Sequence, residues 1–163
     1  MAGTILSINT SQRKGGRKTP VSFGVAHVVA QSGLEGDGHA GFEHRQVSLL
    51  AWESIQKAQA MGLDVKEGDF AENITTKDID LLTLPLGTRL RLGDVRLELS
   101  QIGKICHQKC AIYYQAGDCI FPKEGVFFVA LNDGDIHVGD AIEIESLGSG
   151  TCEFTRQKIK PEH

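Results

Sequence analysis

Short runs of alternating apolar and polar residues predict a chain built mainly of β-strands. The alternation has the period of a half-buried strand, and glycine, asparagine or aspartate separates most runs. Gly93 and Asp94 join two of these runs as the turn of a predicted hairpin. The predicted strands are 3–9, 21–29, 47–50, 71–76, 86–92, 95–100, 126–131 and 141–145.

One segment, residues 51–61, has the period of a helix instead. Ala51, Ile55 and Ala58 recur at i, i+4 and i+7, and Gly62 follows where a left-handed C-cap would lie. Seven or eight short strands with one or two short helices predict a mainly β fold, either a barrel or a closed sandwich. We expect one domain at 1–147, followed by a polar tail at 148–163.

Charge and hydropathy exclude some classes of function. The 163 residues include 17 Lys and Arg against 21 Asp and Glu, a net charge of −4 that argues against a nucleic-acid partner. The basic stretch 13–18 has glycines between its charges and is interpreted as a solvated loop. No apolar run approaches the ~18 residues of a membrane span, and the first residues lack a signal-peptide pattern. We therefore expect a cytoplasmic protein that does not associate with membranes.

The densest group of reactive side chains lies just after the predicted strand 95–100. Its members are Lys104, Cys106, His107, Lys109, Cys110 and Cys119. The positive neighbours of Cys106 favour its thiolate, which is the nucleophilic and metal-binding form. Three interpretations stay open. Cys106 is a nucleophile or metal ligand, or Cys106, His107, Cys110 and Cys119 form a structural zinc site, or the thiols pack in the core.

Two glycine-rich segments carry further polar side chains. In residues 36–41 the glycines would let the backbone approach a ligand. Asp37 and His39 there, with Arg45 close behind, would supply an acid or base and a donor pair for phosphate; a flexible loop is the alternative. In residues 68–76, Glu72 and Asn73 would point to opposite faces of a strand, so one could reach a barrel mouth. Hydrogen-bonded turn residues are the other explanation.

Taken in order, these segments resemble the MOSC domain, which is named for the C-terminal part of molybdenum cofactor sulfurases. The resemblance extends from about residue 3 to 145 and is to the small stand-alone members. The matching segments are 36–41, 45–50, 68–75, 86–90, 101–107, 124–127 and 139–140. The resemblance implies a β-barrel related to the barrel domain of pyruvate kinase. It also implies a pocket for the molybdenum cofactor (molybdopterin), a pterin with a phosphate tail whose dithiolene holds the metal.

The resemblance further implies roles for single residues. The hallmark cysteine of the family falls on Cys106, which would ligate molybdenum in a reductase or carry sulfur as a persulfide, with His107 beside it as a catalytic candidate. The cofactor-binding candidates are Asp37, His39, Arg45, Asn73 and Lys104. Because the sequence carries no pyridoxal-phosphate desulfurase domain, the expected protein partner is a separate desulfurase or an electron-transfer protein. Edge strands of a small barrel would support a homodimer.

Two functions therefore compete. In the first, the protein binds the molybdenum cofactor and either passes on cofactor or sulfur or reduces N-hydroxylated compounds. In the second, it is a non-enzymatic thiol or zinc-binding module that uses Cys106, Cys110 and Cys119. The first predicts that substituting Cys106 is far more damaging than substituting Cys110 or Cys119. The second predicts that all three substitutions are equally damaging.

Overall fold

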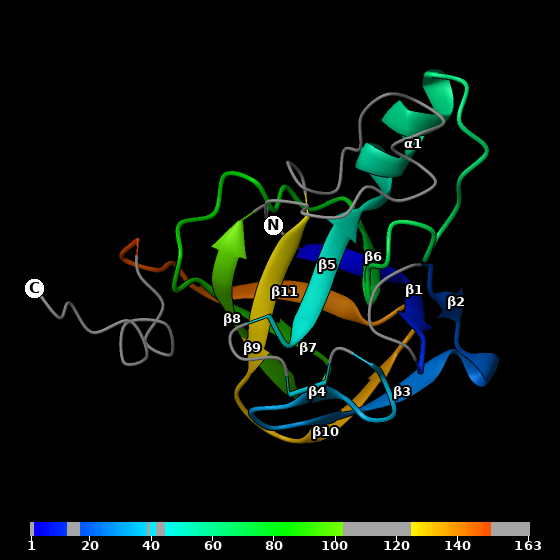
Figure 1. Cartoon of the computed structure of the whole chain (residues 1–163). Coiled ribbons are helices and arrows are strands. Elements are labelled where there is room, and N and C mark those ends of the chain that lie inside the picture. The colour runs from blue at the N-terminus through cyan, green and yellow to red at the C-terminus, as the bar shows by residue number, and fades with distance from the viewer. Residues whose placement is uncertain (1, 13–16, 39, 42–44, 103–124, 151–163) are drawn as a thin grey trace, which may run out of the picture.

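The computed structural model describes residues 2–12, 17–38, 40–41, 45–102 and 125–150, which form a closed β-barrel (Figure 1). The barrel strands are β1 (Ala2–Thr10), β5 (Val47–Ala51), β6 (Ile74–Lys77), β7 (Arg89–Leu92), β8 (Val95–Ile102), β9 (Val126–Ala130) and β11 (Ala141–Ser146). They follow one another in the order β11-β7-β8-β9-β5-β6-β1, and pairing of β1 with β11 closes the barrel. Only β5 and β6 run parallel, so the barrel is mixed among the described strands. The predicted mainly β-barrel fold is confirmed.

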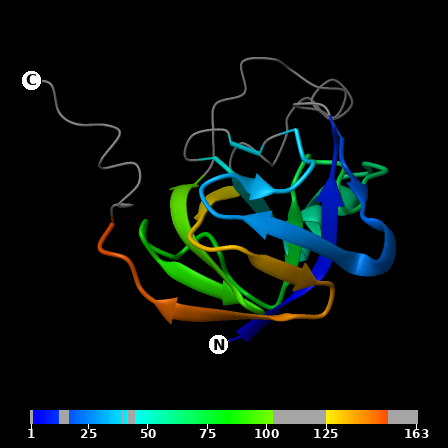
Figure 2. The same cartoon turned by 90° about the horizontal axis from the view of Figure 1, so that it is seen from below.

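The other elements lie at the two ends of the barrel. Strand β2 (Thr19–Pro20) pairs antiparallel with the end of β1. Strands β3 (Val25–Val29), β4 (Gly33–Leu34) and β10 (Gly134–His137) form a separate three-stranded sheet. Figures 1 and 2 show this small sheet across one end of the barrel and helix α1 (Trp52–Ala60) at the opposite end. Val28, Leu34 and Ile136 pack into the barrel core, so the small sheet closes its end.

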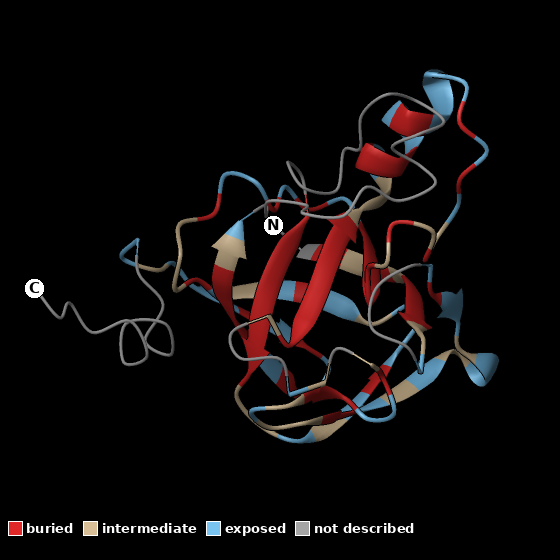
Figure 3. Ribbon diagram, viewed as in Figure 1, coloured by how far each residue is buried: buried red, intermediate tan, exposed pale blue. Residues whose placement is uncertain are grey.

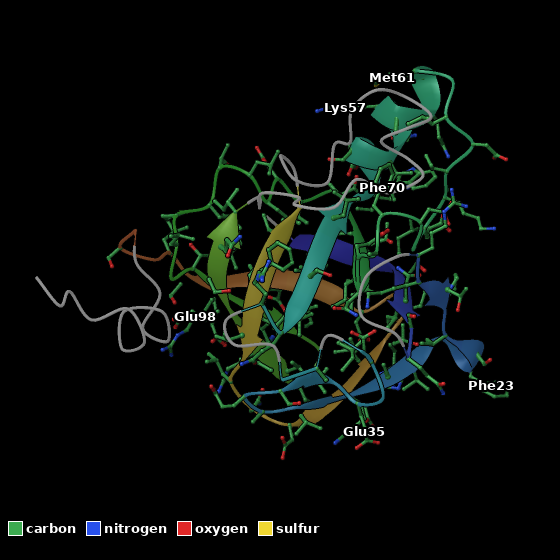
Figure 4. All side chains as sticks on the ribbon, in the orientation of Figure 1. Phe23, Glu35, Lys57, Met61, Phe70 and Glu98 are labelled. Atoms are coloured by element: carbon green, nitrogen blue, oxygen red, sulfur yellow. The ribbon has the colours of Figure 1, made fainter. Side chains whose placement is uncertain are left out.

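Two hydrophobic clusters pack on opposite faces of the same strands. The first fills the barrel, draws residues from all seven barrel strands and includes Leu49 and Val126. The second contains the next residues along, Leu50 and Phe127, together with buried residues of α1 and Phe70. Because successive residues of a strand point to opposite faces, the second cluster lies outside the barrel wall. Figure 4 shows Phe70 in this position, beneath α1 and beside the end of β5.

The outer face of the barrel differs from one side to the other. On β7, exposed arginines alternate with buried leucines, so that outer wall faces solvent. On β5 and β9, by contrast, every residue except Ala51 is buried (Figure 3). Both faces of these two strands are therefore covered. A covered outer wall allows polar side chains to be held in fixed positions outside the barrel core, as a binding site requires.

Some local predictions are wrong. The predicted strand 21–29 contains a 3₁₀ turn at Ser22–Gly24, where Phe23 has φ 63° and is fully exposed. Figure 4 shows Phe23 pointing away from the barrel. Val21 still bonds to Ile8 of β1, and the ladder with β10 starts only at Val25, so the turn lies where the chain passes from one strand neighbour to the other. The predicted strand 71–76 instead starts at Ile74, because Ala71 has a left-handed φ of 67°.

Candidate functional site

Asn73 joins three strands on the covered side of the barrel. It directly precedes β6, and its Oδ1 accepts hydrogen bonds from the backbone N–H and the hydroxyl of Ser48 in β5, at 3.0 and 3.3 Å. The N–H of Asn73 donates to Ser48 Oγ at 3.0 Å. Its Nδ2 donates to the backbone oxygen of Asn9 in β1, at 3.3 Å. A single buried amide thus fixes the relative positions of β1, β5 and β6.

Asp37, in the glycine-rich segment 36–41, forms a buried ion pair with Lys18. Lys18 Nζ lies 2.7 Å from Asp37 Oδ1, and the two side chains are 1% and 0% exposed. The same oxygen accepts the Ser11 N–H at 3.0 Å. Burial raises the pKa of Asp37, but the bonds from Lys18 and Ser11, the charge of Lys18 and the Asn73 amide outweigh it. The pKa of Asp37 therefore lies below its ordinary 3.8.

The interpretation of residues 13–18 as a solvated loop is wrong for Lys18. Arg17 is exposed as expected, but Lys18 is only 2% exposed. The physical reason is its partner: a lysine is buried in a protein interior only with a compensating negative charge, which Asp37 supplies. Residues 13–16 of this stretch lie outside the described residues.

Glu72 is a fully buried carboxyl next to Asn73. Its Oε2 accepts the Gly68 N–H at 3.0 Å and the Thr75 hydroxyl at 2.8 Å. Its Oε1 is also buried and has no hydrogen-bond partner among the described residues. Burial raises the pKa of Glu72 from its ordinary 4.5 to about 6, against the lowering effect of the two hydrogen bonds. Glu72 is thus hydrogen-bonded within the turn that leads into β6, whereas Asn73 bonds across to β5 and β1.

Gly68 lets this turn approach the segment that carries Lys18. The Lys18 N–H donates to Gly68 O at 2.7 Å. Gly68 has a φ of +88°, and a Cβ at this position would collide with the backbone oxygen of Lys18. A left-handed conformation and a close backbone contact both require glycine here. The contact brings the Lys18–Asp37 pair next to the turn that holds Glu72 and Asn73.

Arg45 lies over the same part of the covered wall. Its guanidinium carbon is 5.9 Å from the centroid of the Phe127 ring, a cation–π distance. Phe127 is the register partner of Ser48, so Arg45 lies beside the point where Asn73 joins the strands. A guanidinium presents its N–H groups as a planar fork that matches phosphate and carboxylate oxygens. Of the cofactor-binding candidates, the structure therefore places Asp37, Arg45 and Asn73 on one side of the barrel.

The cysteine-bearing segment is attached at the same edge. Positions 103–124, with Lys104, Cys106, His107, Cys110 and Cys119, lie outside the described residues, as does His39. Their described neighbours Ile102 and Val126 are register partners in β8 and β9. Val126 in turn pairs with Leu49, the residue after Ser48. The described residues on either side of positions 103–124 therefore lie at the wall that holds Asn73 and Arg45.

Sequence reasoning missed Lys18, Ser48 and Asn9. For Ser48 a signal exists: it is the polar residue within an apolar run, and β5 is buried on both faces. For Lys18 and Asn9 nothing in the local sequence indicates burial. Among the described residues, no group of three or more His, Cys, Asp or Glu side chains could hold a metal ion.

Comparisons with known proteins agree with this architecture. The family model described as MOSC domain matches residues 35–143. The YUAD protein from Bacillus subtilis superposes with a TM-score of 0.73 at 16% identity, over 87% of this chain and 94% of that one. YiiM from Geobacillus stearothermophilus superposes with a TM-score of 0.69 at 22% identity, over 92% of this chain and 78% of that one. YiiM from Escherichia coli superposes with a TM-score of 0.68 at 19% identity, over 96% of this chain and 76% of that one.

At these identities the structural similarity concerns the fold alone. No curated protein sequence matches the chain. No helix in the described part of the chain has the length and hydrophobicity needed to cross a membrane.

Proposed function

The chain belongs to the MOSC domain family, and from this membership we propose that it binds the molybdenum cofactor on the covered side of its barrel. One observation carries the proposal: three segments distant in sequence, around Asp37, Ser48 and Asn73, meet there through buried hydrogen bonds. All three segments lie within the matched residues 35–143. Buried polar networks that are tied together in this way hold their side chains in one arrangement, which ligand binding requires.

Arg45 is a described group on this wall that suits an anionic ligand. It lies beside Phe127, and a guanidinium binds phosphate through paired hydrogen bonds. Lys18 and Asp37 neutralise one another, so Asp37 adds no net negative charge to the site. Glu72 is fully buried next to Asn73, and its carboxyl bonds to Gly68 and Thr75.

We assign the phosphate to Arg45 and Lys104, and the wall of the pocket to Asp37, His39 and Asn73. Asn73 and Asp37 contribute by shape, because their polar atoms bind Ser48, Asn9, Ser11 and Lys18. Cys106, with Lys104 and His107 beside it in sequence, supplies the soft anionic sulfur as metal ligand or as persulfide carrier. When bound, a molybdenum centre supplies two-electron redox chemistry, which reduction of an N-hydroxylated compound needs. A desulfurase or an electron-transfer protein would be the partner in the two cases.

Metal and pterin analysis tests the proposal. The protein is purified without air from cells that make the cofactor, and molybdenum, tungsten, zinc and oxidised-pterin fluorescence are measured per chain. We expect molybdenum and pterin in the wild type, little molybdenum in Cys106→Ala, and a lower pterin content in Arg45→Met. Arg91→Met is the matched control, because Arg91 is half exposed and pairs with Glu143 on the solvent-facing wall. It should retain the wild-type content.

Two outcomes would contradict the proposal. A wild-type protein that contains neither molybdenum nor pterin when the cofactor is abundant would remove its basis. Stoichiometric zinc that is lost equally in Cys106→Ala, Cys110→Ala and Cys119→Ala would establish the thiol module instead. If cofactor binding is found, a hydroxylamine-reduction assay and persulfide detection on Cys106 separate the reductase from the carrier.

A further inference from the structure

We propose that the Lys18–Asp37 ion pair is a positioning device, which fixes the glycine-rich segment 36–41 against the barrel. The proposal rests on the proposed function only for the identity of the site that the segment serves. Backbone hydrogen bonds to Ser11, Ser32 and Leu34 also hold this segment, but its glycines add conformational freedom.

Stability alone does not account for this pair. Both side chains are at most 1% exposed, and among the described residues Asp37 Oδ1 is the one acceptor of the Lys18 ammonium. An ammonium has three N–H donors, and Asp37 Oδ1 accepts one of them. Burying two charges removes their hydration, and a well-packed apolar pair is often as stable or more so. An arrangement that is dispensable for stability but fully buried indicates a role in specifying geometry.

The pair connects segments that are distant in sequence. Lys18 directly precedes β2, and its backbone N–H is bonded to Gly68 O at 2.7 Å. Asp37 lies beyond β4 and reaches Ser11, which follows β1. The Gly38 N–H also donates to Ser11 O at 2.6 Å, so Ser11 and residues 37–38 exchange two hydrogen bonds. One ion pair thus places the glycine-rich segment relative to β1, to β2 and to the turn that leads to Asn73.

The charge of Asp37 is what makes this placement specific. Its oxygen accepts a charged donor and a backbone donor at once, and such charge-assisted bonds are shorter and more directional than neutral ones. Because these donors hold Asp37 ionised, it is not a proton donor at neutral pH. Lys18 in turn is neutralised, so the pair adds no net charge to the site.

The test compares Lys18→Met/Asp37→Asn with wild type by hydrogen exchange and thermal unfolding. The substituted asparagine keeps an acceptor for the Ser11 N–H, so the double variant removes the ion pair alone. Lys18→Met alone leaves a buried unpaired carboxylate and should lower Tm by roughly 6–20 °C. The double variant should unfold within a few degrees of wild type. Its Gly38 and Gly41 amides, which bond to Ser11 and Ser32, should nevertheless exchange at least ~10-fold faster, with Leu99 in β8 unchanged.

The control pair is Arg89→Met/Glu98→Gln, which removes a second ion pair with a buried carboxylate at the opposite wall. It should leave exchange at Gly38 and Gly41 at the wild-type rate. If the double variant does not fold, Lys18→Gln/Asp37→Asn gives the same comparison, because it also removes both charges but keeps a hydrogen-bonding amide at each position. Wild-type protection of Gly38 and Gly41 in a folded variant that lacks the pair would overturn the proposal.

Pterin content then links the device to the site. We expect the folded double variant to contain several-fold less pterin than wild type, and the control pair to contain the wild-type amount. A wild type without pterin would count against the proposed function, but the exchange rates of Gly38 and Gly41 would still decide whether the ion pair positions the segment. Faster exchange together with unchanged pterin would overturn the connection to the site.

Discussion

Glu72→Gln should make the unfolding free energy of the protein less dependent on pH. Glu72 is fully buried, its Oε2 accepts two hydrogen bonds, and its Oε1 has no partner among the described residues. Glutamine has the same shape and keeps a carbonyl oxygen for the Gly68 N–H and the Thr75 hydroxyl. The substitution therefore removes the ionisation while leaving the packing in place.

The sign and size follow from the raised pKa of Glu72. A pKa of about 6 in the folded state, against an ordinary 4.5, means that the folded protein binds this proton more tightly than the unfolded chain. The protonated carboxyl therefore favours folding. Its contribution is fully present below pH 4.5 and is lost as the pH rises through about 6. At 1.36 kcal/mol for each pKa unit, the loss is about 2 kcal/mol.

Urea unfolding at a series of pH values from 4 to 7.5 measures this loss. The informative quantity is the unfolding free energy of the wild type minus that of Glu72→Gln, because titration of all other groups cancels in the difference. We expect this difference to fall by about 2 kcal/mol between pH 4.5 and 7. The glutamine N–H₂ lacks an acceptor at the Oε1 position, but that penalty is the same at every pH.

Glu143→Gln is the control, since Glu143 is half exposed and pairs with Arg91 on the solvent-facing wall. It reports the effect of removing one surface charge. A free-energy difference between wild type and Glu72→Gln that stays constant from pH 4.5 to 7 would refute the reasoning. A difference that rises with pH would show that hydrogen bonding to Glu72 outweighs its burial.

Three further substitutions test the local geometry. Gly68→Ala places a Cβ against the Lys18 backbone oxygen at φ +88° and should lower the unfolding free energy by more than ~2 kcal/mol in urea; unchanged stability would contradict the close contact. Asn73→Asp replaces the donor to Asn9 O by an oxygen, and should cost ~2 kcal/mol or more at pH 7 by the same assay. Phe23→Gly should raise stability by about 1 kcal/mol, seen as a higher Tm, because Phe23 is fully exposed at φ 63°. A lower Tm would instead show that Phe23 makes contacts in solution.

The barrel strands could be predicted because each half-buried strand carries its own period. The runs 86–92 and 95–100 correspond to β7 and β8, with Gly93 at a positive φ in the turn. Strand β10 has only Ile136 buried in four residues, and so short a segment shows no period. It is extended because β3 pairs with it, which local sequence does not reveal.

Only those site residues that lie in recognisable motifs could be predicted from the sequence. Asp37, Arg45 and Asn73 lie in segments whose glycines and polar side chains indicate a site. The burial of Lys18 has no such local signal, because its neighbours are charged and glycine-rich. Its burial depends on Asp37, which is 19 positions away in sequence. The role of Asn73 likewise depends on Ser48, which is 25 positions away. A hydrogen bond between distant residues leaves no periodic signal in the chain.

The pairing of β1 with β11 also determines when the barrel can close during synthesis. Ala2 pairs with Glu143, so the first and last strands of the barrel are neighbours. Until Ala141–Ser146 has left the ribosome, β1 and β7 each keep an open edge with unpaired backbone groups. Closing a ring through its most distant segments is slow, because the loop entropy is lost before the contact forms. Such open edges favour aggregation of newly made chains, and pairing of Ala141–Ser146 with β1 removes them.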